Sequence, residues 1–472
     1  MWNANRLYVV CFRHIEDESS LGRTARRGAR APRTMGAGDL VVVSATCGSD
    51  GDARPCAMLA DALGEVLRET RVVFMSNPTF ERECARAEFV GVGDGDEYEA
   101  MRRDHGGRGR DGGAIVRFWM SIWEEHARKL EKLISSSRGR IIIMAHTLDL
   151  AVRCIEEREI RERGVRSRVE CFSVVLSPAL VRKPDLKIPP YLYETVSCIR
   201  PRRLAVWFAH RLVDAAFVPR LNQFRAASMG SNDPVRGGVF EDWFLCRRGA
   251  FAMYPEMFAQ APEGFHQVCF PLASPDVDES SCEAVRKVRR FIDRADSPTI
   301  VFVSASGNPP FAAKYFKAAA KAMRALGSCA QAVFLTRHAD RLPPLPNNSI
   351  HIPFLPLEAC AGIHIDLFVS HGTIGCLAHA LRFGWPQLVV PAAWDQPFHA
   401  ALLRSITNAR ALPMKCLTWR RLRRVMEEIL DDEVALVEAR RIAKKLEADS
   451  ASITDVAVVI AGRLNEPICD LN

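Results

Sequence analysis

Two polar clusters in the last third of the sequence have residue types that suit binding of a sugar phosphate. The first is His-Gly-Thr at residues 371–373, which directly follows the apolar run Leu367–Ser370. The second contains Asp395 and Gln396, and it follows the next apolar run. A glycine turn that leads into a helix leaves unpaired backbone N–H groups and a partial positive charge, which attract phosphate. A carboxylate and an amide suit the vicinal hydroxyls of a sugar.

The spacing around these clusters predicts a βαβ unit that holds both on one side of a sheet. Gly384 and Pro386 are typical of the end of a helix. The apolar runs at 367–370 and 388–390 are then buried parallel strands. Ligands of open α/β sheets bind beyond the carboxyl ends of the strands, where both clusters lie. Apolar residues recur at helical spacing between these strands: Ile374, Leu377, Ala378 and Leu381.

The composition indicates a globular protein with room for two domains. Of 472 residues, 48% are hydrophobic and 25% are charged. No apolar run approaches the ~20 residues that span a bilayer. The formal net charge of +8 is spread along the chain, so it gives no reason to expect nucleic acid. The 15 cysteines lack C-x-x-C spacing and predict reduced thiols in a cytoplasmic protein; peripheral contact with the inner face of a membrane and the oligomeric state stay open.

The first 38 residues differ from the rest of the chain. They are rich in Arg, Gly and Ala and show no sustained periodicity, so we expect them to be disordered. They are either a targeting peptide or an over-extended start, with Met35 as the true initiator, and we favour the second interpretation.

A second candidate site lies in the loop that follows the apolar run at residues 40–43. This loop, residues 44–52, ends in Asp52, and we expect the next helix to begin at Pro55. A carboxylate at the end of a strand can act as a general base in a cleft. Asp52 is our candidate base and Asp50 the second choice, although an aspartate before a helix can instead cap it.

Both segments resemble those of one enzyme family. DLFVSHGTIGCLAHALRFGWPQLVVPAAWDQPFHAALL, residues 366–403, resembles the nucleotide-sugar signature of GT-B glycosyltransferases of the UDP-glycosyltransferase superfamily. GSDGDARP, residues 48–55, resembles the loop that opens the bacterial antibiotic and sterol glycosyltransferases of this superfamily. The resemblance implies an α/β protein with the GT-B fold, in which two Rossmann-like domains face each other across a cleft.

This resemblance also implies a division of the chain. Residues 39–272 would form an acceptor-binding domain and residues 298–450 a nucleotide-sugar-binding domain, with a linker at 273–297. Residues 451–472 would form a helix that returns to the first domain, and residues 1–38 the extension.

Three segments of the first domain carry structural expectations of their own. Residues 94–113 are polar and rich in Gly and Arg, so we expect a mobile loop. Residues 115–134 are expected to be helical. The basic, aromatic segment 202–221 is expected to be a helix over the acceptor cleft, with a position on a membrane surface as the alternative.

The resemblance implies inverting, metal-independent transfer of a hexosyl group from a UDP- or dTDP-sugar to a hydroxyl of a small, lipophilic acceptor. Asp52 would take the proton of that hydroxyl. No cofactor is implied besides the donor, and the D-x-D tripeptides at 50–52 and 94–96 are interpreted as turns rather than a metal site. The residues implied to bind the donor are Ser306, Pro356, Leu357, His371, Gly372, Thr373, Gly375, Cys376, Trp394, Asp395 and Gln396.

Five positions depart from the family pattern, and they keep an alternative open. Thr373 replaces a glycine, Cys376 a serine or threonine, and Ala305 a glycine. His379 and His399 stand where Glu or Gln and Asn are usual. The alternative is a degenerate GT-B protein that acts as a non-catalytic partner of another glycosyltransferase. A nucleotide-sugar epimerase of the same fold fits the Asp-Gln pair less well.

Overall fold

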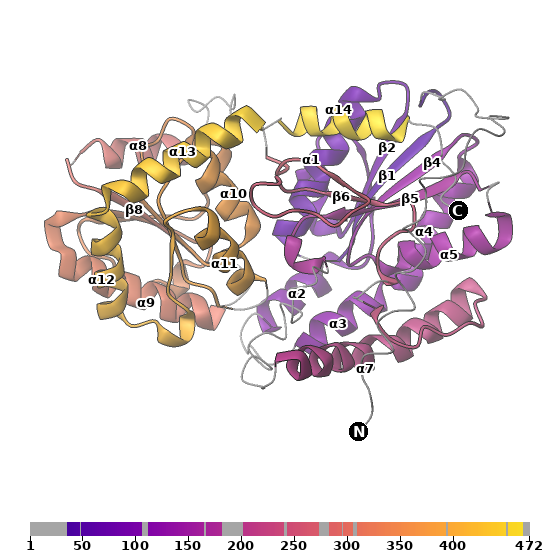
Figure 1. The fold of residues 1–472 in the computed structure, drawn as a ribbon, viewed down its shortest axis with the longest axis horizontal. Helices are drawn as coiled ribbons and strands as arrows, with labels where there is room; N and C mark the ends of the chain where they lie inside the picture. Colours follow the sequence, from indigo (N-terminus) through magenta and orange to yellow (C-terminus); the bar gives the residue numbers. More distant parts are fainter. Residues whose placement is uncertain are drawn as a thin grey trace, which may run out of the picture.

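The chain forms two α/β domains that lie side by side (Figure 1). Each is a parallel sheet with helices packed against it, as alternating apolar runs and helical patterns predict. The computed structural model describes residues 35–47, 49–105, 112–164, 167–181, 202–239, 243–272, 283–294, 296–304, 309–392, 395–449 and 452–465.

Among the described residues, the first sheet has seven strands in the order β3-β2-β1-β4-β5-β6-β7, all parallel. The central strands are uninterrupted apolar runs because both of their faces are covered. The order reverses between β1 and β4, which places a crevice at their carboxyl ends. The strands are β1 (Leu40–Ala45), β2 (Arg71–Ser76), β3 (Glu88–Gly91), β4 (Ile141–His146), β5 (Val169–Val175), β6 (Ala250–Ala252) and β7 (Phe265–Gln267).

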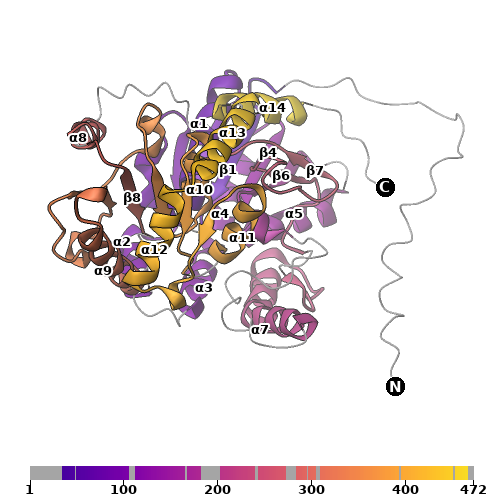
Figure 2. The same ribbon diagram turned by 60° about the vertical axis from the view of Figure 1, so that its left-hand side comes forward.

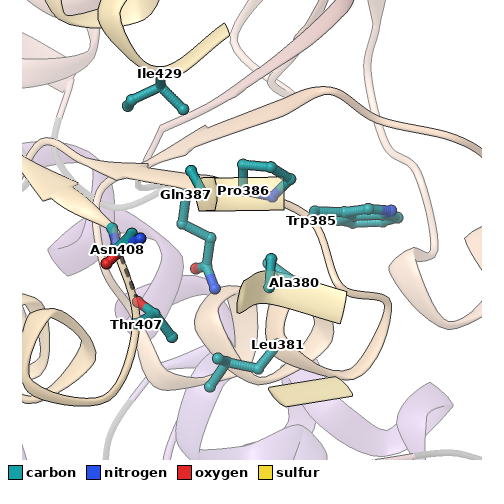
Figure 3. Close-up of a pocket in the computed structure, with 11 residues that line it drawn as sticks. Ala380, Leu381, Trp385, Pro386, Gln387, Thr407, Asn408 and Ile429 are labelled. Atoms are coloured by element: carbon teal, nitrogen blue, oxygen red, sulfur yellow. Dashed lines mark hydrogen bonds between the residues drawn. The ribbon is translucent and has the colours of Figure 1, made fainter. Parts of the chain in front are cut away.

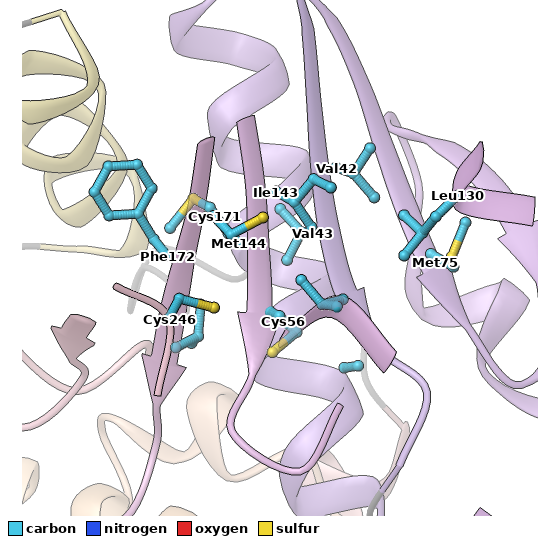
Figure 4. Packing of buried hydrophobic residues seen from close by; sticks show 14 of the residues in the cluster. Val42, Val43, Cys56, Met75, Leu130, Ile143, Met144, Cys171, Phe172 and Cys246 are labelled. Atoms are coloured by element: carbon cyan, nitrogen blue, oxygen red, sulfur yellow. The ribbon is translucent and has the colours of Figure 1, made fainter. Parts of the chain in front are cut away.

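Helices cover this sheet and form the core with it (Figure 4). Cys56 of α1 is fully buried against the sheet, and Leu130 of α4 lies beside Met75 of β2. The helices of the first domain are α1 (Asp50–Val66), α2 (Gly95–His105), α3 (Gly112–Ser121), α4 (Trp123–Ser136), α5 (Leu150–Arg163) and α7 (Arg202–Met229).

The polar segment 94–113, expected to be a mobile loop, instead contains α2 and the start of α3; residues 106–111 lie outside the described part. The Asp94 carboxylate accepts hydrogen bonds from two backbone N–H groups of the first turn of α2, at 2.7 and 3.0 Å. Tyr98 is buried, with its ring 5.7 Å from the rings of both Phe80 and Phe118. A cap and one buried aromatic ring therefore fold a segment whose composition favours a loop. The helix expected at 115–134 is two helices, α3 and α4.

Helix α7 lies on the outer side of α3, α4 and α5 (Figures 1 and 2). One face of it is buried in the core of the first domain, where Val213, Phe217 and Leu221 lie. Trp207 and Phe208 are exposed near its beginning. No helix in the described ranges is long and apolar enough to cross a membrane.

In the described part of the second domain, six parallel strands have the order β10-β9-β8-β11-β12-β13. The order reverses between β8 and β11, so this sheet has its own crevice. The strands are β8 (Thr299–Val303), β9 (Gln331–Leu335), β10 (Ser349–Ile352), β11 (Leu367–Ser370), β12 (Gln387–Val389) and β13 (Arg410–Ala411). The helices are α8 (Glu283–Ile292), α9 (Pro309–Leu326), α10 (Ile374–Arg382), α11 (Gln396–Ile406), α12 (Trp419–Leu430) and α13 (Glu433–Asp449).

The linker expected at 273–297 includes helix α8. Val285 and Val288 of α8 are buried in an apolar cluster with strands β8 and β9. The two valines lie three residues apart and therefore on one face of α8. Since that face packs on strands of the second sheet, α8 belongs to the second domain. Residues 273–282 lie outside the described part.

Both ends of the described chain meet on the first domain. Helix α14 (Ile453–Leu464) lies against α1, and its apolar residues belong to the core of the first domain (Figure 1). The backbone N–H of Met35 donates to Asn465 Oδ1 at 2.8 Å. Residues 35–38, expected to be disordered, are therefore part of this domain; residues 1–34 and 466–472 lie outside the described part.

Candidate active site

Residues at the carboxyl ends of central strands from both sheets come together between the domains. Asp52 follows β1, and His146 is the last residue of β4. In the second domain His371 follows β11, and Asp395 follows β12. The negative charge of Asp395 acts on the pKa of Asp52 from across the interface. The two switch points, where open α/β sheets bind ligands, thus face one common site.

A capping box with Ser49 holds Asp52 at the start of α1. Asp52 Oδ2 accepts hydrogen bonds from the backbone N–H of Ser49 at 2.6 Å and from its hydroxyl at 3.1 Å. Ser49 Oγ in turn accepts the N–H of Gly51 at 3.3 Å. The helix therefore begins at Asp50 rather than at Pro55, which lies in its second turn. Asp52 caps the helix from inside its first turn, so the cap uses Oδ2 and leaves Oδ1 outside the capping box.

The second oxygen of Asp52 faces His146. Asp52 Oδ1 lies 3.5 Å from Nε2 of His146, and the Asp52 side chain is 30% exposed. Burial raises the pKa of the Asp52 carboxyl; His146 and the Ser49 N–H lower it, and Asp395 raises it again. The net effect is a raised pKa, which moves this carboxylate towards the range of an effective general base.

Buried polar groups fix the loop that carries Asp52. The Asp149 carboxylate, at the start of α5, accepts hydrogen bonds from the Ser44 hydroxyl at 2.6 Å and the Thr46 hydroxyl at 2.8 Å. It also accepts the backbone N–H of Cys47 at 3.1 Å. His126 of α4 contacts both hydroxyls, at 3.0 and 3.2 Å. Since every member of this network is buried and bonded, the loop between β1 and α1 has one preferred geometry.

His371 is buried, and it is neutral near pH 7. Burial lowers the pKa of His371 to about 4, although a hydrogen bond to the Val303 backbone and the charge of Asp395 raise it. The ring therefore donates its one proton to Val303. Its Nδ1 atom is buried and has no hydrogen-bond partner among the described residues. A buried, unpartnered ring nitrogen is costly, so a partner for this atom would be stabilising.

Gly372 is required by the tight approach of two strand ends. Its φ of +92° lies in the left-handed region, which favours glycine. A Cβ atom at this position would lie 2.7 Å from Cγ1 of Val389 and 3.4 Å from the carbonyl oxygen of Gln396. The turn after β11 therefore accepts glycine only, and it brings helix α10 close to β12.

The first turn of α10 has no capping side chain. Thr373 is the N-cap residue, and its hydroxyl makes no capping bond within the described part of the chain. The N–H groups of Ile374, Gly375 and Cys376 have no carbonyl partner inside the helix. Burial raises the pKa of the Cys376 thiol, which is therefore neutral. This turn presents backbone donors and the positive end of the helix dipole beside His371.

Asp395 and Gln396 stand in the loop after β12, but they differ in exposure. Asp395 precedes α11, and its side chain is 31% exposed. Gln396 is buried, and its Oε1 atom accepts the backbone N–H of Ala392 at 2.9 Å. The amide oxygen, which we expected to bind sugar hydroxyls, thus holds the loop itself, while Asp395 is half-buried and the more exposed member of the pair.

His399 connects the donor side of the site with the first domain. Its Nδ1 atom lies 3.1 Å from the carbonyl oxygen of Gly372, and its Nε2 atom lies 2.7 Å from Oγ of Ser177. Because a carbonyl only accepts, Nδ1 carries the proton and Nε2 accepts the Ser177 hydroxyl. The same Nε2 lies 3.6 Å from Oδ2 of Asp395. Apolar contacts between the domains surround this bond, including those of Phe258.

Pro356 and Leu357 lie half-buried at the start of a short 3-10 helix (Leu357–Cys360) that follows β10. Nearby, Phe354 is 44% exposed. The guanidinium of Arg337 lies 4.9 Å from its ring centroid, and that of Arg54, from α1, lies 5.3 Å away. Arginines of both domains thus lie over one exposed aromatic ring.

Two of the expected donor-binding residues, Ser306 and Trp394, lie outside the described residues. The others lie along one side of the second domain at the ends of β10, β11 and β12, which brings Leu357, His371 and Asp395 to the same edge of the sheet.

A small pocket lies elsewhere in the second domain, among α10, β12 and α13 (Figure 3). It encloses about 10 Å³, which is room for roughly one water molecule. The Oε1 atom of Gln387, which lines it, is buried without a partner among the described residues. A nucleotide sugar does not fit in this volume, so the candidate site is the interdomain region and not this pocket.

Comparisons with known proteins agree with this arrangement. Residues 320–461 match the family model of the erythromycin biosynthesis protein CIII-like C-terminal domain. O-mycaminosyltylonolide 6-deoxyallosyltransferase of Streptomyces fradiae is 32% identical over 111 residues, which are 22% of this chain and 25% of that protein. 3-alpha-mycarosylerythronolide B desosaminyl transferase of Saccharopolyspora erythraea is 27% identical over 142 residues, 29% of this chain and 32% of that protein. The matched segments thus span about a quarter to a third of these relatives.

Solved structures match nearly the whole chain. The glycosyltransferase of kitacinnamycin superposes with a TM-score of 0.64 at 18% identity, over 91% of this chain and 99% of that chain. The chain has the GT-B fold. The glycosyltransferase VinC in complex with dTDP gives a TM-score of 0.53 at 14% identity, over 90% of this chain and 100% of that chain. The GT-B resemblance expected from the sequence is therefore confirmed for the fold, and residues 320–461 are similar to the erythromycin biosynthesis protein CIII-like C-terminal domain.

Sequence reasoning missed two residues of this GT-B site. His146 ends a buried strand, and nothing in its neighbourhood in the sequence marks it as close to Asp52. His399 was expected only as a departure from the family pattern, yet it joins Ser177 to the Gly372 turn. A polar residue at the end of an otherwise apolar strand is the one signal that singles out His146.

Proposed function

We propose that this GT-B protein transfers a hexosyl group from a UDP- or dTDP-sugar to a hydroxyl group of a small, lipophilic acceptor. The observation that carries the proposal is that the charge of Asp395 acts both on Asp52 of the first domain and on His371, which lies beside the uncapped first turn of α10. A carboxylate on one side and phosphate-binding donors on the other are the two groups that such a transfer requires.

The donor would lie on the second domain. Backbone N–H groups of the α10 first turn would hold the diphosphate, with His371 as a further partner. The half-buried Asp395 carboxylate would accept hydrogen bonds from hydroxyls of the sugar. The dTDP complex of VinC supports a nucleoside diphosphate donor by analogy.

The acceptor would lie on the first domain, beside Asp52. The two relatives act, by their names, on glycosylated tylonolide and erythronolide, which supports a lipophilic acceptor of this type. Asp52 would take the proton of the acceptor hydroxyl as its oxygen attacks C1 of the sugar. The diphosphate would leave from the opposite face of the sugar, so the configuration at C1 inverts.

The leaving diphosphate would be stabilised by fixed donors of the protein. Transfer would need no metal ion, because the helix dipole and the N–H groups of residues 374–376 supply the positive potential. His371 would add a charge-assisted hydrogen bond once its Nδ1 atom gains a proton.

Calorimetric titration of UDP and of dTDP into the full chain tests this function. We expect the chain to bind at least one of the two nucleotides, and we expect this binding to be lost or strongly weakened in His371→Ala. His364→Ala is the matched control, because His364 is 58% exposed and bonds to Asp366 away from the α10 turn. No heat with either nucleotide, or equal affinity in His371→Ala, would overturn the proposal and favour a non-catalytic partner.

A further inference from the structure

His146 is buried, yet the polar atom that faces the site lacks a close partner. Only 1% of the residue is exposed. Its Nε2 atom has no hydrogen-bond partner among the described residues and lies 3.5 Å from Oδ1 of Asp52. Buried polar atoms are nearly always bonded, so an atom in this position calls for an explanation.

The hydrogen bond at the other ring nitrogen, Nδ1, decides which nitrogen of the neutral His146 ring carries the proton. Nδ1 of His146 accepts the backbone N–H of Leu148 at 3.4 Å. An N–H group only donates, so Nδ1 holds a lone pair and the neutral ring carries its proton on Nε2. The neutral His146 ring therefore carries its N–H on the nitrogen that lies 3.5 Å from Asp52, and it cannot accept a proton from an acceptor hydroxyl at Nε2.

The two oxygens of Asp52 consequently have different tasks. Oδ2 is occupied by the two hydrogen bonds from Ser49. Oδ1 faces His146 and the interdomain site. We infer that His146 is a positioning residue for the base, donating its Nε2–H to Asp52 Oδ1 and stabilising the ionised carboxylate. This inference rests on the proposed function, in which Asp52 is the base.

The parallel pairing of β1 with β4 makes this contact possible. Ser44 of β1 pairs with Ala145 of β4, the residue just before His146. The Asp149 network holds the loop after β1, and the backbone N–H of Asp149 bonds to the carbonyl of His146. Strand pairing and this network thus set the 3.5 Å separation of the two side chains, which is a few tenths of an ångström longer than a usual N–H···O hydrogen bond.

The inferred step balances without any further reactant. The acceptor O–H bond breaks and its proton goes to Asp52 Oδ1. The acceptor oxygen forms a bond to C1 of the sugar, and the C1–O bond to the diphosphate breaks with its electron pair on the leaving oxygen. His146 keeps its proton throughout. Its N–H faces the Asp52 carboxylate both before and after that carboxylate takes the proton from the acceptor.

Other charged groups around Asp52 shape its titration. Asp395 faces it from the second domain and raises its pKa. Arg54, two residues further along α1, is paired with Glu83 at 2.8 Å and is thereby directed elsewhere. The Asp149 carboxylate is occupied by the Ser44, Thr46 and Cys47 groups. Within the described part of the chain, His146 is the donor side chain that the Asp52 carboxylate faces outside its capping box.

Nitrogen NMR of the full chain labelled with ¹⁵N-histidine tests the contact directly. The signal of His146, among 12 histidines, is identified by its loss in His146→Gln. We expect the neutral ring to be the Nε2–H tautomer and the Nε2 signal to change in Asp52→Asn. Asp50→Asn, which removes the neighbouring carboxylate, should leave this signal in place. The Nδ1–H form, or a His146 signal that does not respond to Asp52→Asn, would overturn the inference.

Kinetics separate positioning from a purely structural role. With UDP-glucose or dTDP-glucose as donor and 4-methylumbelliferone as acceptor, His146→Leu should lower kcat about 10- to 100-fold, the scale found when a partner that orients a reactive group is lost. KM for the donor should change little, and the pH at half-maximal kcat should rise. His146→Gln should recover most of the rate, since its amide supplies an N–H near the Nε2 position. Equal rates of the Leu and Gln variants would contradict the inference.

Two controls keep the outcomes distinct. His266→Leu changes a half-buried histidine on the edge strand β7, far along the sheet, and should leave kcat and the pH profile unchanged. UDP and dTDP titrations report donor binding without turnover. Absent nucleotide binding with an intact His146 response therefore rejects the proposed function alone, whereas normal binding without that response rejects the role of His146 alone.

Discussion

Nε2 of His399 in the second domain lies 2.7 Å from Oγ of Ser177 in the first, and both residues are buried. The same imidazole faces the carbonyl of Gly372 through Nδ1. One side chain thus links the first domain with the turn that begins α10, and the geometry of the candidate donor site depends on how the domains meet.

Ser177→Ala should destabilise the chain by about 1–3 kcal/mol, because it leaves Nε2 of His399 buried without a donor. Each kcal/mol corresponds to a fall of about 2–4 °C in Tm for domains of this size. Calorimetric melting measures the shift. Ser405→Ala, on the exposed side of α11, is the control and should change stability by less than about 0.5 kcal/mol. Equal Tm values for the two variants would show that this bond contributes nothing.

Gly372→Ala should destabilise the second domain by about 1–3 kcal/mol and abolish nucleotide binding, since the new Cβ meets Val389 at 2.7 Å and the φ is +92°. Gly375→Ala, three residues along, is the matched variant for stability. A Cβ there meets nothing within 4 Å, and alanine in a helix is favoured by up to about 1 kcal/mol. Denaturant unfolding compares the two, and similar midpoints would refute the steric argument.

Acid should destabilise the folded chain through His371. Its pKa falls from 6.5 to about 4 on folding because the ring is buried. Between these values the unfolded chain binds a proton that the folded chain does not, so stability that is complete above about pH 6.5 is lost as the pH falls towards 4. The loss should reach about 3 kcal/mol. Denaturant midpoints at pH 7 and 4.5 measure it, and His371→Gln should show a smaller difference between the two pH values.

Nucleotide binding should take up a proton near pH 7. His371 already gives one proton to Val303, so its Nδ1 atom must gain another before it can donate to a phosphate. Calorimetry in two buffers of different ionisation enthalpy measures the uptake, which should approach one proton and vanish in His371→Gln. Zero uptake by the unmodified chain would mean that His371 stays neutral and does not donate to the diphosphate.

Much of the fold follows from local patterns in the sequence. The βαβ unit around His371 is encoded by two apolar runs, an apolar helical face and a terminal Gly384. Each of these signals can be recognised from a few consecutive residues or from helical spacing. Helix α2 was not predicted from the sequence, because the few buried contacts of this helix, chiefly those of Tyr98, are with residues distant in sequence. The polar composition of the segment indicated a loop, and it gave no sign that Asp94 caps a helix.

The sequence by itself determined the βαβ unit with its Gly372 turn, the strand before Asp52 and the candidates Asp52, His371 and Asp395, because turns, caps and helical faces depend on neighbours a few residues away. Only the tertiary structure decided that His146 faces Asp52 and that His399 meets Ser177, 222 residues apart. These contacts depend on strand order, on the parallel register of β1 and β4, and on the packing of one domain against the other. No local pattern specifies those three quantities, since each is fixed by the burial of apolar surface across the whole fold.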